Sequence, residues 1–105
     1  RVGLRDNIMD VISTDHAPHT KQEKERGFFK APFGIVGSET AAALTYTKLV
    51  LGGYLTPIQM VEKMSYNPAR ILGIDRGNMG VGKTADLTIF DPHVKWQIHA
   101  KDFAG

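Results

Sequence analysis

The chain has 105 residues, no cysteine and a formal net charge of only +2, so it is long enough for one small domain. The lack of cysteine excludes disulfides and thiolate metal sites, which leaves His, Asp and Glu as possible metal ligands. The balanced charge excludes a basic nucleic-acid-binding stripe, and no apolar run approaches the roughly 20 residues that span a bilayer. A cytoplasmic protein without nucleic-acid or membrane partners is therefore expected.

The first predicted element is a short buried strand over residues 10–14, a β-branched run with polar neighbours. Pro18 follows closely and blocks its continuation as a helix or central strand. Residues 15–37 show no periodicity, and a loop of this length is usually functional or disordered. Its phenylalanines favour an ordered loop over a site. Within it, the charged run 21–26 is predicted to be a solvated loop that is mobile without substrate.

Three helices are predicted to follow this loop. The first covers residues 39–51, with Ser38 as its N-cap and Gly52-Gly53 at its end. The second begins at Thr56-Pro57, where a Thr cap, a Pro at the first helical position and a Gln three residues after the cap coincide. A third, shorter helix is predicted to start at Asn67-Pro68 and to end at Gly73.

Two alternating segments near the C-terminus, residues 85–92 and 94–98, are predicted to be strands. One strand, then helices, then a few terminal strands cannot form a stable sheet unaided. We therefore expect the chain to be a piece of a larger protein whose remaining strands lie upstream. The lack of a starting methionine agrees with that expectation.

Residues 77–84 match the phosphate-binding pattern G-x-x-x-x-G-K-[ST] letter for letter. A true phosphate-binding loop follows a buried strand and opens a helix, because the helix N-terminus supplies the converging N–H donors. Here a helix end precedes the match and a predicted strand follows it. A glycine-rich turn is the favoured interpretation. A nucleotide-binding module stays open as the alternative, which a helix from Lys83 onward would support.

The strongest candidate for chemistry is Asp15, at the C-terminal end of the first predicted strand, where barrel enzymes place catalytic groups. By itself Asp15 could simply cap a turn. His16 and His19 lie within the same five residues. A carboxylate and two imidazoles are the side chains from which metal-hydrolase sites are built. In such a site zinc lowers the pKa of bound water to about 7, and a carboxylate can carry the proton to a departing nitrogen.

Two segments resemble a specific family. Residues 13–20, Ser-Thr-Asp-His-Ala-Pro-His-Thr, are similar to the final metal-ligand motif of the dihydroorotases. Residues 32–40 are similar to the segment that follows this motif there, at matching spacing. Two further segments, 67–73 and 80–87, resemble sequences that are widespread among amidohydrolases. The resemblance therefore covers essentially the whole chain, and its first two motifs are the ones that point to dihydroorotases.

The resemblance implies an α/β fold that is the C-terminal portion of a (β/α)8 TIM barrel with the returning strands of a small β-sandwich. Residues 1–74 would hold the last barrel strand, the active-site loop and the closing helices. Residues 75–105 would form the C-terminal part of the sandwich domain.

The same resemblance implies roles for individual residues. Asp15 would be a metal ligand and the general acid/base, and His19 would contact the carboxylate-bearing substrate. Phe33 and Gly34 would meet the substrate ring through their backbone. His16 is expected to pack or hydrogen-bond behind the site. Two other histidines are expected to be ordinary surface residues: His93 and His99.

The implied activity is the zinc-dependent, reversible hydrolysis of dihydroorotate to N-carbamoyl-L-aspartate in pyrimidine biosynthesis, with two zinc ions in the intact enzyme. Possible partners are further copies of the enzyme or aspartate carbamoyltransferase. Because the His-x-His pair and the other family ligands are missing here, this chain alone is expected to be inactive. The alternatives are another cyclic amidase, such as a hydantoinase or allantoinase, and a non-catalytic homologue.

Overall fold

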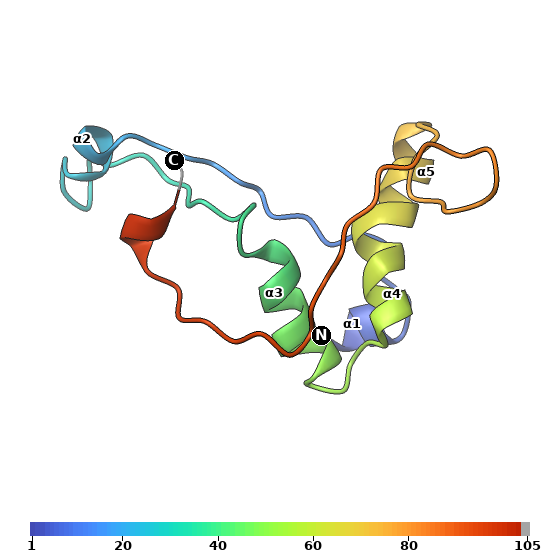
Figure 1. Ribbon diagram of the computed structural model, residues 1–105. Coiled ribbons are helices and arrows are strands. Elements are labelled where there is room, and N and C mark those ends of the chain that lie inside the picture. The colour runs from blue at the N-terminus through green and yellow to red at the C-terminus, as the bar shows by residue number, and fades with distance from the viewer. Residues whose placement is uncertain (104–105) are drawn as a thin grey trace. The chain divides into compact units, whose positions relative to one another are not determined.

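The computed structural model describes residues 1–103, and the chain divides into two compact units. The first joins residues 1–13 to 43–94, and the second joins residues 14–42 to the segment from Lys95 onward. The domain boundary predicted at residue 74 stays a prediction. The last two residues of the predicted second domain, 104–105, lie outside the described residues. Short helical elements follow one another along the chain (Figure 1): α1 (Val2–Arg5), α2 (Lys21–Lys24), α3 (Ala41–Thr45), η1 (Tyr46–Val50), α4 (Pro57–Val61), η2 (Glu62–Tyr66), α5 (Asn67–Leu72) and η3 (Ala100–Asp102).

The predicted helix over 39–51 is confirmed in its body but begins later, at Ala41, where α3 runs directly into the π-helical turn η1. The delay has a local cause. The backbone N–H of Ser38 donates to a side chain, His16 Nδ1, at 3.2 Å, and the residues before α3 form a turn instead of helix. At the other end, the predicted stop at the two glycines is confirmed, since Gly53 takes a left-handed φ of 81°.

The predicted start at Thr56-Pro57 is confirmed in detail. The Gln59 N–H donates to Thr56 Oγ1 at 3.2 Å, and the Thr56 N–H donates to Gln59 Oε1 at 2.9 Å, which completes a reciprocal capping box. From this start α4, η2 and α5 form one uninterrupted helical column, as Figure 1 shows.

The predicted third helix from Asn67-Pro68 is confirmed as α5 (Asn67–Leu72), but it is not separate from the second helix, because the π-helical turn η2 runs into it without a break. Asn67 does not cap a helix, since its Nδ2 donates to the Asp10 carbonyl at 2.8 Å. In a regular α-helix the Pro68 ring would clash with the carbonyl four residues earlier, and the wider π-helical turn η2 directly before it relieves that clash. The predicted end at Gly73 is confirmed by its left-handed φ of 69°.

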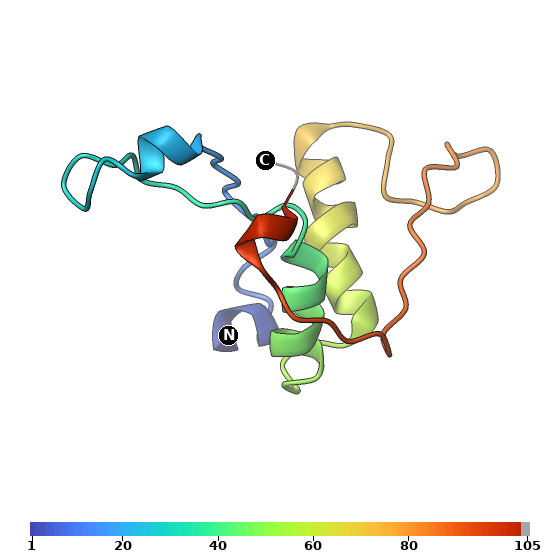
Figure 2. The ribbon, with the colours of Figure 1, turned by 60° about the vertical axis from the view of Figure 1, so that its left-hand side comes forward.

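The predicted strands over 10–14, 85–92 and 94–98 are not formed, and residues 1–103 contain no β-strand. A strand needs a neighbouring strand to pair its N–H and C=O groups, and these segments have none. Ile12 instead donates its N–H to the carbonyl of Lys63, on a helix, at 2.9 Å. After residue 75 the chain continues without an arrow as far as η3 (Figure 2), so the sandwich prediction has no support here.

Within residues 1–103 few side chains are buried, and three of the six are polar or charged: Thr40, Thr45 and Lys63. Lys63 is the most buried of them at 2% exposure. Its Nζ donates to Asn7 Oδ1 at 3.0 Å and to the Met9 carbonyl at 2.5 Å. This buried lysine therefore ties the segment after α1 to η2.

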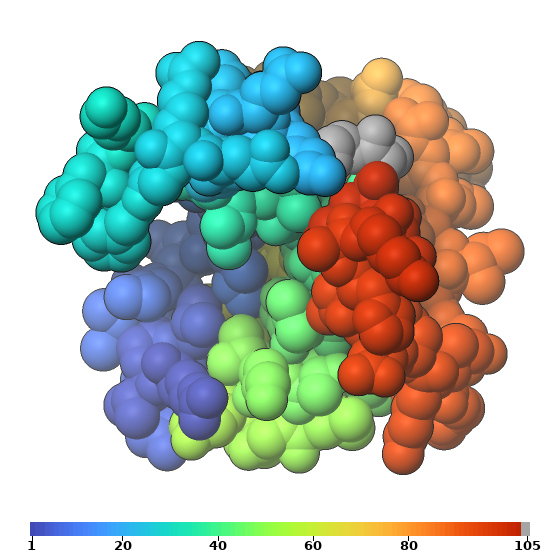
Figure 3. All heavy atoms as spheres, turned by 90° about the vertical axis from the view of Figure 1, so that its left-hand side faces the viewer, coloured from blue at the N-terminus to red at the C-terminus, as the bar shows by residue number. Residues whose placement is uncertain are grey.

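Many large apolar side chains among residues 1–103 are exposed, for example Phe28, Phe29 and Ile58. Figure 3 shows the segment around residue 30, in cyan, at the surface. None of the helices in residues 1–103 has the length and apolar character needed to cross a membrane.

Candidate active site

Asp15 stands in an unusual backbone conformation with its carboxylate unengaged. Its φ is 49°, in the left-handed region that aspartate tolerates better than most residues. Beside it, the His16 N–H donates to Thr14 Oγ1 at 3.2 Å, which helps to shape the turn. Within residues 1–103 the exposed Asp15 carboxylate makes neither a hydrogen bond nor an ion pair. Backbone strain of this kind collects at functional sites, and an unpaired carboxylate there is free to accept a metal or a proton.

His16 is engaged in structural hydrogen bonds. Its Nδ1 accepts from the N–H of Gly37 at 2.9 Å and from the N–H of Ser38 at 3.2 Å. A ring nitrogen that accepts carries no proton, so neutral His16 has its proton on Nε2 and offers no free acceptor nitrogen to a metal. These bonds join the Asp15 turn to the residues that lead into α3.

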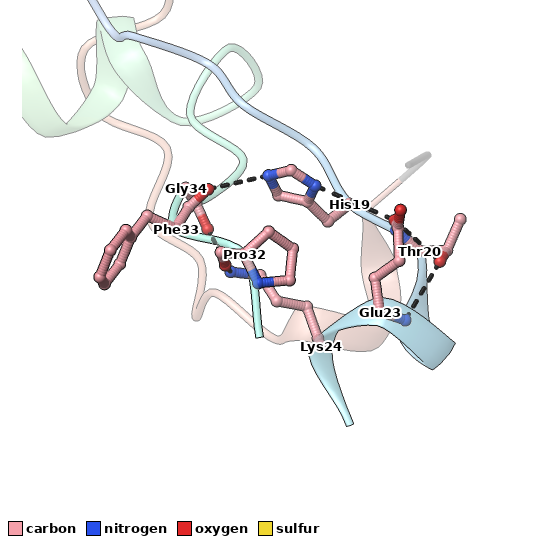
Figure 4. A network of polar contacts seen from close by, with 7 residues as sticks. All are labelled: His19, Thr20, Glu23, Lys24, Pro32, Phe33 and Gly34. Carbon is pink, nitrogen blue, oxygen red and sulfur yellow. Dashed lines mark hydrogen bonds and ion pairs between the residues drawn. The ribbon is translucent and has the colours of Figure 1, made fainter. Parts of the chain in front are cut away.

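The structure brings His19, Phe33 and Gly34 together, although 14 positions of the chain separate the first two (Figure 4). His19 Nε2 lies 2.8 Å from the Phe33 carbonyl oxygen and donates to it. Gly34 takes a φ of 123°, and a Cβ built there would lie 2.7 Å from the Ala17 Cβ. The pairing is reinforced by the Ala17 N–H, which donates to the Ile35 carbonyl at 3.0 Å. No hydrogen bond joins Asp15 to these residues in the described structure.

The run 21–26 is solvent-exposed as predicted, but the prediction of a loop is wrong for its first four residues, because Lys21–Lys24 form the helix α2. A capping box begins it: the Glu23 N–H donates to Thr20 Oγ1 at 3.3 Å, and the Thr20 N–H donates to Glu23 Oε2 at 2.8 Å. The Thr20 N–H and then its hydroxyl hold the pKa of the Glu23 carboxyl below its usual range. The mobility predicted for this run stays a prediction.

Lys24 is a contributor that the sequence analysis missed. From the last position of α2 its Nζ donates to the Pro32 carbonyl at 2.8 Å and to the Gly34 carbonyl at 2.6 Å. Figure 4 shows Lys24 and His19 reaching the same short run of backbone. The T-x-x-E pattern from Thr20 to Glu23 could have revealed the helical turn, and with it the direction in which Lys24 extends.

The residues present can supply one ligand of a metal site, but not a complete set of ligands. No group of three or more His, Asp or Glu side chains that could hold a metal exists within residues 1–103. Asp15, with its free carboxylate, suits a single coordination position, while His16 and His19 each commit a ring nitrogen to backbone groups. His93 and His99 are exposed, as expected.

The alternative of nucleotide binding lacks the helix it requires, because no helix occurs between residues 84 and 99. Lys83, which would have to face phosphate, forms an ion pair with Asp75 at 3.0 Å. The segment is a turn, in which the Gly80 N–H donates to Asn78 Oδ1 at 2.6 Å.

Comparison with known proteins identifies the family of the chain. The model of the amidohydrolase family matches residues 1–105. The chain belongs to the amidohydrolase family.

Three of its relatives carry the name dihydroorotase. The chain is 52% identical over 104 residues to that of Pelotomaculum thermopropionicum, with 99% of this chain and 24% of the relative covered. It is 46% identical over 98 residues to that of Clostridioides difficile, with 93% and 23% covered. It is 48% identical over 100 residues to that of Clostridium acetobutylicum, with 95% and 24% covered. The chain thus spans about a quarter of the length of these relatives.

Proposed function

We propose that this chain supplies the Asp15 turn and the returning substrate loop of a dihydroorotase. The reaction would be the reversible hydrolysis of dihydroorotate to N-carbamoyl-L-aspartate, in which water adds to the ring amide and the C–N bond breaks. The observation that carries the proposal is the match of 46–52% identity to proteins named dihydroorotase over nearly the whole chain. The loop geometry supports it, because His19, Phe33 and Gly34 converge there.

In the proposed mechanism Asp15 has two tasks. Its free carboxylate is one metal ligand, and it accepts the proton of the attacking water and delivers it to the departing ring nitrogen. When bound, zinc lowers the pKa of coordinated water to about 7 and polarises the amide carbonyl. His19 and the backbone of Phe33 and Gly34 bind the acidic substrate beside Asp15.

Several finer parts of the proposal rest on family membership. Residues 10–14 would form the last strand of a TIM barrel once neighbouring strands are present to pair with them. Two zinc ions, the remaining ligands and a role in cytoplasmic pyrimidine biosynthesis belong to the proposal as well. Association with further copies of the enzyme or with aspartate carbamoyltransferase stays a prediction.

A chimera tests the proposal directly. In the Pelotomaculum thermopropionicum dihydroorotase, the matching segment is replaced by this chain, and dihydroorotate hydrolysis is measured with and without zinc. We expect zinc-dependent turnover that falls by about a thousandfold in Asp15→Asn, since general acid–base groups contribute 10²–10⁴-fold. His93→Gln is the matched control, because His93 is exposed and its turnover should be unchanged.

Two other outcomes separate the alternatives. A folded chimera that opens hydantoin or allantoin but not dihydroorotate would move the chain to another cyclic-amidase branch. A folded, zinc-loaded chimera without activity on any cyclic amide would refute the proposed function and favour a non-catalytic homologue.

A further inference from the structure

Three consecutive carbonyls of the loop, those of Pro32, Phe33 and Gly34, all accept hydrogen bonds from cationic or imidazole side chains. Lys24 Nζ serves the first and the third, at 2.8 and 2.6 Å, and His19 Nε2 serves the middle one at 2.8 Å. Lys24 therefore bonds the carbonyls on either side of the one that His19 bonds (Figure 4). We propose that Lys24 is a positioning residue, which fixes the substrate-facing backbone at Phe33 and Gly34. This inference rests on the proposed function, because substrate binding by the backbone of Phe33 and Gly34 is part of that function.

The three bonds also determine which backbone groups remain for a ligand. Every peptide unit contains the carbonyl of one residue and the N–H of the next. The bonds at Pro32 and Phe33 therefore engage the carbonyl ends of the units whose N–H groups belong to Phe33 and Gly34. Neither of these N–H groups has an acceptor within residues 1–103. The loop thus presents donors, while its acceptors are occupied.

Charge-assisted hydrogen bonds on the carbonyl side strengthen the donor on the other end of a peptide, because hydrogen-bonded dipoles polarise one another. Lys24 therefore makes the Phe33 N–H a better donor, and His19 does the same for the Gly34 N–H. Two free and polarised N–H groups suit an anionic or carbonyl-bearing ligand, which is the chemistry of dihydroorotate and N-carbamoyl-L-aspartate. Lys24 thus orients the loop through its carbonyls, and the N–H groups of Phe33 and Gly34 stay available to a ligand.

The neighbouring lysine on α2 provides a matched control. Lys21 lies on the same short helix, and its partner is Glu25 at 3.7 Å with both side chains well exposed. It donates to no carbonyl of the 32–34 run. Lys21→Met and Lys24→Met are therefore the same chemical change on the same helix, and only the second removes donors from the loop.

The experiment uses the dihydroorotase chimera described above, in which KM and kcat for dihydroorotate are measured for both variants and for Lys24→Arg. We expect Lys24→Met to raise KM about tenfold with a smaller change in kcat, because only part of the population then holds the binding-competent loop. Lys21→Met should stay within about twofold of the unmodified chimera. Lys24→Arg should recover most of the loss, since a guanidinium can donate to both carbonyls.

Amide hydrogen exchange gives a second, activity-independent test. The Ala17 N–H, which bonds the Ile35 carbonyl across the loop, should exchange faster in Lys24→Met than in Lys21→Met. An unchanged KM in an active Lys24→Met chimera, or equal effects of the two methionine variants, would overturn the positioning role. A folded, zinc-loaded unmodified chimera without activity on any cyclic amide would overturn the proposed function and the substrate part of this inference. Ala17 exchange would then still decide whether Lys24 holds the loop.

Discussion

Lys63 provides the sharpest test of how the first unit is held together. Its ammonium group is almost fully buried and has two oxygen partners, Asn7 Oδ1 and the Met9 carbonyl. Its own backbone carbonyl accepts the Ile12 N–H. Lys63→Met keeps most of the side-chain length and removes the donors. We expect the residues around Ile12 to detach from the helix more often in this variant.

The magnitude follows from the partners. A hydrogen bond to a charged group contributes about 1.5–3 kcal/mol, and two are lost. Asn7 and Met9 are exposed, so water can replace part of the loss, and removing a buried charge offsets more of it. We therefore expect the opening free energy to fall by about 2 kcal/mol. Lys63→Ala also removes three buried methylenes at about 0.8 kcal/mol each, so its loss should be near 4 kcal/mol.

Native-state hydrogen exchange at the Ile12 amide measures this opening in the chimera. A loss of about 2 kcal/mol corresponds to roughly thirtyfold faster exchange. Lys48→Met is the matched control, because Lys48 lies exposed on η1 and should change exchange by less than about 0.5 kcal/mol. If Ile12 exchanges equally fast in the Lys63→Met and Lys48→Met variants, the buried lysine does not anchor this segment.

Two further predictions concern the loop. Gly34→Ala should abolish substrate binding in the chimera, since its Cβ would lie 2.7 Å from the Ala17 Cβ. Gly27 has a φ of 87° but open space around it, so Gly27→Ala should be tolerated at a cost of about 1 kcal/mol in thermal unfolding. Comparison of the two variants separates the steric clash of a Cβ from the strain of a left-handed backbone. Because folding lowers the pKa of Glu23, the α2 cap should be fully stabilising above the unfolded-state pKa and lost as pH falls through the folded one. NMR titration of the Glu23 carboxyl and the Thr20 amide measures this. Thr20→Val removes the hydroxyl and keeps the backbone N–H, so it should raise the Glu23 pKa only part of the way to its usual range.

Local signals predicted the helices well, because caps and stops act over a few residues. The Thr56 capping box and the left-handed Gly73 appear where the sequence indicated them. The break predicted at Pro68 failed because a π-helical turn can absorb a proline, and sequence spacing does not reveal that register change. The strands failed for a different reason. Alternation at 85–92 shows which residues would suit a sheet, but only a pairing partner makes a strand.

At the candidate site, the sequence pointed to candidate residues but not to the contacts between them. The resemblance selected His19, Phe33 and Gly34, and the structure shows that they meet. That His19 holds the Phe33 carbonyl depends on how the loop folds back, which no spacing rule encodes. Lys24 escaped notice because a lysine in a charged run usually faces solvent. The grouping of Asp15 with further metal ligands stays a prediction.

The exposed apolar side chains bear on how substitutions in this chain should be interpreted. A side chain such as Ile58, 73% exposed here, has little of its transfer free energy realised within this chain. Its replacement by serine should therefore be nearly silent in the unfolding of the isolated chain. Where other polypeptide covers the same face, that replacement would cost as much as a change in a protein core. Tolerance at such a position therefore depends on whether other polypeptide covers it, and a mutational scan of the chain alone reports only the contacts that the chain makes with itself.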